Sequence, residues 1–142
     1  MELSANELRI GNLITIDNSV YWLELRDIPL IVTHIGQTMN IKGESSHSVG
    51  CEHINPKTNT YYEIYPQFIE NIKPIQLTEE WLLKFGFEKD NELNFVKFSF
   101  KVHFWSNYNS YMYGWIGGNI EIKYVHQLQN IYFALTGQEL TI

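Results

Sequence analysis

The segment that most constrains the fold is YVHQLQNIYFALTGQEL, residues 124–140, near the end of the chain. Gly137 can adopt the left-handed conformation that ends a helix. Apolar side chains before it recur at the spacing of one helix face. They are Val125, Leu128, Ile131, Tyr132 and Leu135. The pattern therefore predicts a helix that buries one face against the rest of the chain.

Length and composition predict one domain with two lobes, residues 1–76 and 77–142. The 142 residues are 44% hydrophobic and 15% aromatic, which is enough to build a core. The formal net charge of -6 disfavours binding to nucleic acid through its phosphates. Cys51 is the one cysteine, so no disulfide forms within the chain. Neither a secretory signal nor a membrane-spanning apolar run is recognisable, so we expect a cytoplasmic protein with no membrane partner.

The first lobe has the pattern of short β-strands. Ser4 and Glu7 have the spacing of a capping box, which predicts one helical turn at the start. Short strands separated by turn-forming residues are typical of a small antiparallel barrel or a strongly bent sheet, and of these we predict a barrel-like sheet. The runs rich in apolar and β-branched residues are 13–16, 20–25, 28–35, 39–41 and 61–75.

Residues 43–60 (GESSHSVGCEHINPKTNT) interrupt this pattern and predict a long loop. His47, Cys51 and His53 lie within it, and His34 could add a fourth ligand for a zinc ion. The spacing of these residues is irregular, whereas zinc ligands normally come in regular pairs. We therefore favour a solvated loop and expect no metal and no cofactor.

The sequence of the second lobe predicts a short helix, a β-hairpin and the C-terminal helix. Thr78 can cap the first helix, and Gly86 can end it. Apolar and polar residues alternate over residues 98–104, which predicts a half-buried strand. Residues 111–115 supply its hairpin partner, and residues 120–124 are either a strand or the first turn of the final helix. The expected fold class is α+β.

Three motifs carry a resemblance. They are LRIGN at residues 8–12, LTEEWLLKFGF at residues 77–87 and YVHQLQNIYFALTGQEL at residues 124–140. With them the chain resembles a widespread group of small uncharacterised bacterial proteins that are often carried by phages and mobile elements. The resemblance implies a small soluble accessory protein, and it brings no enzymatic activity and no catalytic residue with it.

The strand and hairpin of the second lobe contain the residue types of a nucleotide-binding platform. Positive charge suits phosphate, and flat rings suit bases. The alternative is that the aromatic rings cover the core and the lysines lie on the solvent-exposed face of a half-buried strand. The platform would consist of Lys97, Lys101, His103, Tyr111, Tyr113 and Trp115.

The polar side of the C-terminal helix offers a second candidate site. His126, Asn130 and Phe133 share one face, with Gln129 next to them. Polar amides around an aromatic ring are typical of a protein-binding surface. The alternative is a buried amide network that orients the helix against a sheet.

No residue set specific for catalysis occurs. Glu79 and Glu80 are adjacent and point in different directions on a helix, which argues against a shared acid-base role. We therefore expect a non-catalytic protein that acts by protein-protein contact. A negatively charged protein can compete for a basic channel, so an inhibitor of a host defence effector such as a nucleic-acid-targeting nuclease is one such role. The alternative is a nucleotide or single-stranded nucleic-acid binder that uses the platform above.

Overall fold

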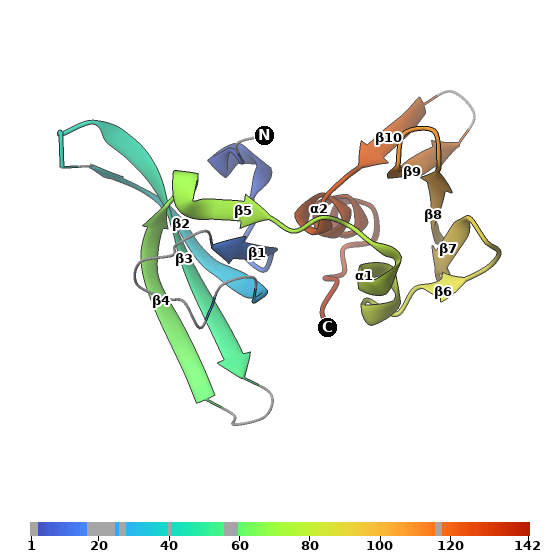
Figure 1. Ribbon diagram of the computed structural model, residues 1–142, viewed down its shortest axis with the longest axis horizontal. Coiled ribbons are helices and arrows are strands. Elements are labelled where there is room, and N and C mark those ends of the chain that lie inside the picture. Colours follow the sequence, from blue (N-terminus) through green and yellow to red (C-terminus); the bar gives the residue numbers. More distant parts are fainter. Residues whose placement is uncertain (1–2, 17–24, 26–27, 40, 56–59, 116–117) are drawn as a thin grey trace. The chain divides into compact units, whose positions relative to one another are not determined.

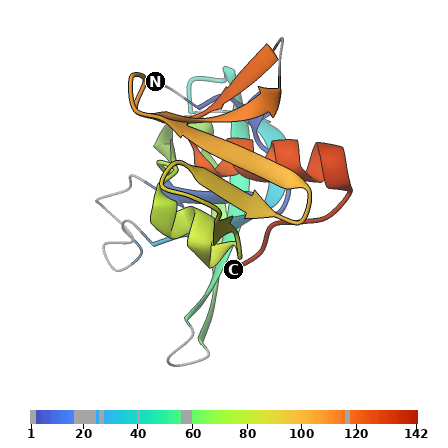
Figure 2. The same cartoon turned by 90° about the vertical axis from the view of Figure 1, so that its right-hand side faces the viewer.

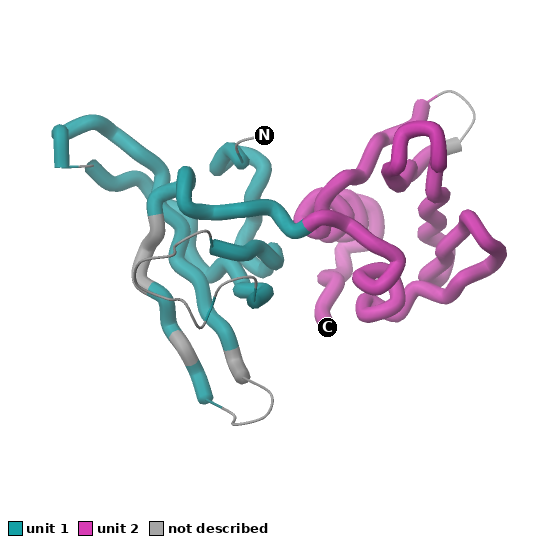
Figure 3. Tube along the Cα trace, in the orientation of Figure 1, with its two compact units in different colours: residues 1–75 teal, residues 76–142 magenta. Residues whose placement is uncertain are grey.

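A computed structural model describes residues 3–16, 25, 28–39, 41–55, 60–115 and 118–142 of the chain. They divide into two compact units, residues 1–75 and residues 76–142, shown in different colours in Figure 3. The described elements of unit 1 are η1 (Ala5–Glu7), β1 (Leu13–Ile16), β2 (Leu30–Met39), β3 (Ser45–Asn55), β4 (Thr60–Phe68), η3 (Ile69–Asn71) and β5 (Ile72–Pro74), labelled in part in Figure 1. The predicted turn at Ser4 is confirmed, because the Ser4 N–H donates to the Glu7 carboxylate at 2.9 Å.

The strands of unit 1 form one antiparallel sheet in the order β4-β3-β2-β1-β5. A buried apolar cluster lies against it and includes Ile14, Leu30, Val32 and Val49. The sheet is open, so the predicted barrel-like closure is wrong. β1 and β5 have only 4 and 3 residues, whereas β2, β3 and β4 have 10, 11 and 9, and among the described residues no pairing joins the edge strands β4 and β5.

The long loop predicted over residues 43–60 is also wrong, because Ser45–Asn55 form strand β3. β3 lies between β2 and β4 and pairs with both, so neighbouring backbones satisfy its N–H and C=O groups despite its poor β-forming composition. Val49 and Cys51 are buried and fix its inward face. Apart from Leu25, which is buried, the strand predicted over residues 20–25 falls almost entirely outside the described residues.

Unit 2 contains a second antiparallel sheet, the C-terminal sheet, in the order β10-β9-β8-β7-β6. It is a meander, since each strand pairs with the next one along the chain. Two helices accompany it, which confirms the α+β class. The described elements are α1 (Glu79–Lys84), β6 (Glu88–Lys89), β7 (Asn94–Lys97), β8 (Phe100–Trp105), β9 (Ser110–Trp115), β10 (Gly118–Ile122) and α2 (Val125–Thr136).

The C-terminal helix α2 is confirmed, including its end. Gly137 has a φ of 71°, and its N–H donates to the Phe133 carbonyl at 2.8 Å. Val125, Leu128 and Tyr132 are buried as the stripe predicts, whereas Leu135 is exposed because the buried face ends one turn before the helix does. Helix α1 likewise starts after Thr78, and Gly86 follows it with a φ of 77°.

The predicted strand over residues 98–104 needs one correction. Phe98 and Ser99 form a two-residue turn between β7 and β8, and Phe98 has a φ of 54°. The strand therefore begins at Phe100, and Lys97 lies opposite Phe100 on the neighbouring strand. At the other end of the sheet, residues 118–122 are strand β10 and Tyr124 is the N-cap of α2, so of residues 120–124 the first three are strand and none lies within the helix.

Candidate functional site

The two faces of the C-terminal sheet carry different side chains. The inner face, on the side of α2, holds Phe100, Val102 and Tyr111, which are all buried. The Phe100 ring contacts Tyr132 of α2 with 5.1 Å between ring centroids. Figure 2 looks onto the opposite, outer face, with α2 behind the sheet. Because strand residues alternate between faces, the outer face receives Lys101, His103, Trp105 and Met112.

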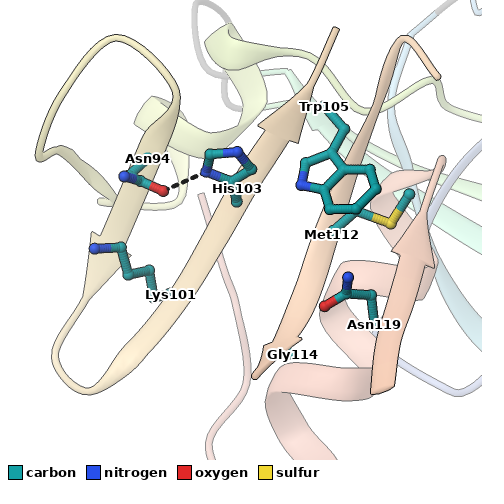
Figure 4. A pocket seen from close by; sticks show the side chains of 7 residues that line it. All are labelled: Asn94, Lys101, His103, Trp105, Met112, Gly114 and Asn119. Carbon is teal, nitrogen blue, oxygen red and sulfur yellow. Dashed lines mark hydrogen bonds between the residues drawn. The ribbon is translucent and has the colours of Figure 1, made fainter. Parts of the chain in front are cut away.

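The outer face contains a hollow of about 410 Å³, named here the outer-face hollow. Figure 4 shows its side chains lying across strands β7 to β10. Trp105 is 38% exposed there, so part of its indole is open to solvent. The residues that line the outer-face hollow are Asn94, Lys101, His103, Trp105, Met112, Gly114 and Asn119.

One hydrogen bond fixes the imidazole in the hollow. His103 Nδ1 lies 2.6 Å from Asn94 Oδ1 on the adjacent strand, where the two residues are register partners. An amide oxygen only accepts hydrogen bonds, so the Nδ1–H of His103 is the donor. The neutral imidazole then presents Nε2 as an acceptor. In Figure 4 this second nitrogen lies on the side of the ring away from Asn94.

The lysines of unit 2 are all engaged by neighbouring oxygens. In the outer-face hollow, Lys101 Nζ lies 3.0 Å from Asp90 Oδ2. Lys97 Nζ donates to the Phe85 carbonyl at 2.5 Å. Lys84, Lys89 and Lys123 form ion pairs with Glu80, Glu79 and Glu121 at 2.8, 2.9 and 3.2 Å. Unit 2 has no arginine, so its surface offers little positive charge that is not already compensated.

The structure does not assemble the predicted nucleotide platform. Tyr111 is buried on the inner face, and Tyr113 stacks on Phe100 with 4.4 Å between ring centroids. Lys97 lies opposite Phe100 and is therefore on the inner face too. Lys101 and His103 lie on the outer face, and the backbone of Trp115 pairs with Gly118 at the end of β9. The turn at Phe98 causes the split, because it places Lys97 and Lys101 on different strands.

The predicted partner-binding face of α2 is largely inaccessible. His126 and Gln129 are 0% and 1% exposed. Gln129 Nε2 donates to the Leu140 carbonyl at 3.1 Å, which agrees with the alternative of a buried amide that orients the helix. Asn130 is half-buried, and Phe133 is exposed. A partner could therefore reach Phe133 and part of Asn130, but not the other two side chains.

The candidate zinc ligands are not gathered into a site. No three His, Cys, Asp or Glu residues converge on a metal position in the part of the chain that the structure describes. His47 and Cys51 are four positions apart on an extended strand, which separates their backbones by about 13 Å. Burial raises the pKa of the Cys51 thiol to about 12, so this side chain keeps its proton. His53 is a half-buried residue of β3, and His34 is an exposed residue of β2.

Sequence reasoning missed most of the outer-face hollow. The alternation of Lys101 and His103 continues to Trp105, and extending the pattern by one residue would have included the indole. Asn94, Met112 and Asn119 join it only through strand pairing, which the local pattern does not specify.

Among the described residues, no helix is both long and apolar enough to cross a membrane. No family model, curated protein or solved structure matches this chain.

Proposed function

We propose that this chain is a non-catalytic, cytoplasmic binding protein that recognises another protein through the outer face of its C-terminal sheet. The observation that carries the proposal is the exposed Trp105 indole in a hollow walled by Met112, His103 and amide side chains. The proposal keeps the mode of action expected from the sequence but moves the contact from α2 to the sheet.

The composition of the hollow favours a protein partner. Tryptophan, tyrosine and methionine are enriched at the centre of protein interfaces, and tryptophan often dominates their binding energy. Asn94 and Asn119 add directional hydrogen-bonding groups at opposite sides of Trp105 and Met112. Tyr108 extends the aromatic surface, since its ring centroid lies 5.7 Å from that of Trp105 and the residue is 62% exposed.

Electrostatics support a protein rather than a polyanion. A nucleic-acid strand would have to displace Asp90 from Lys101, and the chain as a whole carries a net charge of -6. Together with the resemblance to phage-borne proteins, this acidity supports a host effector, such as a nucleic-acid-targeting nuclease, as the class of partner.

The test is affinity capture from a bacterial lysate with matched variants. The wild-type chain and Phe98→Ala should retain one stoichiometric protein, since Phe98 is exposed at the β7–β8 turn outside the hollow. Trp105→Ala should lose it, and with the purified partner its Kd should rise by about 30-fold or more. Capture of no stoichiometric partner, or equal capture by Trp105→Ala, would contradict the proposal.

A second candidate is a nucleotide or single-stranded nucleic-acid binder that uses the outer face instead of the predicted platform. The observation in its favour is that Trp105 shares the hollow with Lys101 and His103, so a stacked base and a phosphate could both be accommodated. It predicts that oligonucleotides quench a part of the tryptophan fluorescence that Trp105→Ala removes. An absence of quenching at low salt would eliminate it.

A further inference from the structure

We propose that the outer-face hollow is a subsite for one tyrosine side chain of the partner, held by its ring and by its hydroxyl. This inference rests on the proposed function and names the chemical group that the partner inserts. Three properties of the hollow carry it: its size, the apolar side chains of Trp105 and Met112, and the imidazole of His103.

The size of the hollow admits an aromatic side chain. Small-molecule sites in proteins occupy about 300–1,000 Å³. A hollow of about 410 Å³ lies within that range, so it has room for a whole aromatic side chain and for part of the backbone that carries it. Gly114 contributes no side chain to its lining, and the backbone of Gly118 and Asn119 lies close against it.

The walls suit an aromatic ring. Trp105 offers an indole surface for offset or edge-to-face packing, and aromatic pairs of this kind are favourable beyond the area that they bury. Met112 lies beside it and can place its thioether sulfur against the ring edge. An aliphatic side chain would lose both of these contacts.

The polar groups select the substituent on that ring. When Nδ1–H donates to Asn94 Oδ1, the neutral imidazole of His103 presents Nε2 as an acceptor, so the hollow favours a ring that carries a hydrogen-bond donor. A carboxylate ligand would have to compete with Asp90 for Lys101. A neutral phenol satisfies these conditions, since its hydroxyl can donate to Nε2.

The test uses two small amides as probes of the purified chain. We expect N-acetyl-L-tyrosinamide to shift the NMR signal of the Trp105 indole N–H, assigned with a Trp105→Phe variant. N-acetyl-L-phenylalaninamide should bind at the same place about fivefold more weakly, because it lacks the hydroxyl. Equal affinities for the two amides, or no movement of the Trp105 signal with either, would overturn the proposal.

Two variants separate the role of the hydroxyl from general ring binding. His103→Phe keeps a ring at this position but removes the acceptor, so it should abolish the preference for the tyrosine amide. Trp81→Phe is the matched control, because Trp81 lies in α1 against Phe85 and outside the hollow, and it should leave the fivefold preference unchanged. An unchanged preference in a folded His103→Phe variant would also overturn the proposal.

The two proposals fail in different ways. If the probes show no preference while capture of a protein still depends on Trp105, the tyrosine subsite is wrong and the protein-binding function stands. If the probes bind as expected but no protein is captured, the subsite stands and the proposed function is wrong.

Discussion

The inner and outer faces of the C-terminal sheet carry aromatic side chains of similar kinds that have different roles. On the inner face, Phe100 touches the rings of Phe87, Tyr113 and Tyr132, and its contacts hold the sheet on α2. On the outer face, Trp105 contacts Tyr108 and lines a hollow open to solvent. Residue type alone therefore does not distinguish an aromatic ring of the core from one that is available for binding. The face of the sheet, which alternates from residue to residue along a strand, does distinguish them.

The comparison is tested most severely by removing a ring from the inner face. Phe100→Ala should lower the free energy of unfolding by about 3–5 kcal/mol, because it leaves a cavity among three aromatic rings. Urea denaturation followed by circular dichroism measures this loss. Phe98→Ala is the control, since Phe98 is 83% exposed and should change the free energy by about 0.5 kcal/mol or less. Equal losses would break the distinction between buried and exposed rings.

The next largest effect is expected where the hollow meets β10. A Cβ at Gly114 would collide with the Gly118 carbonyl oxygen, and Gly114 has a φ of 149°. Gly114→Ala should therefore destabilise the β9–β10 pairing by about 1–3 kcal/mol and speed amide exchange in Asn119 and Ile120. Gly118→Ala is the matched control, because its Cβ would meet no atom within 4 Å. Similar exchange rates in both variants would show that the close approach at Gly114 is unimportant.

A pH series can distinguish a buried tyrosine from an exposed one. Burial raises the pKa of Tyr111, and the negative charge of Glu79 adds to the effect. Above pH of about 10 the unfolded chain releases a proton that folded Tyr111 retains. The free energy of unfolding should therefore fall as the pH rises, by at most about 1.4 kcal/mol per pH unit from this group.

The control for this series is Tyr108→Phe at the exposed ring. Urea midpoints on either side of pH about 10 should show a weaker alkaline loss in Tyr111→Phe than in the wild type. Tyr108→Phe should behave as the wild type does. If both variants reduce the alkaline loss of stability equally, the burial of Tyr111 is not the cause of that loss.

The smallest change in stability is expected on the outer face. Trp105→Ala should alter the free energy of unfolding by only about 0.5–1 kcal/mol, because its one described ring contact is the exposed Tyr108. The same denaturation assay applies. A loss as large as that of Phe100→Ala would make Trp105 a structural residue and remove the main support for the binding site.

The helices could be predicted because their signals are local. Gly137 and the stripe Val125, Leu128 and Tyr132 specify α2 within one short segment, and Thr78 and Gly86 bound α1 in the same way. Strand β3 could not be predicted, because Ser, His and Gly residues give it little β propensity of its own. Its pairing with β2 and β4 outweighs that composition.

The site was harder to predict than the fold because it depends on register. Lys97 and Lys101 have the same parity along the chain, yet the turn at Phe98 and Ser99 places them on opposite faces. That turn contains neither glycine nor asparagine, so its residue types do not predict a turn. Once the turn is known, the alternation from Phe100 onward places Lys101, His103 and Trp105 together.

The burial of Cys51 has a practical consequence for experiments on the outer face. It is the one cysteine of the sequence, it is 0% exposed, and its thiol resists ionisation. Maleimide dyes or spin labels attached through a cysteine engineered on β10 should therefore react at that position alone while the chain is folded. Distances from such a label to a bound partner could be measured without first replacing the natural residue.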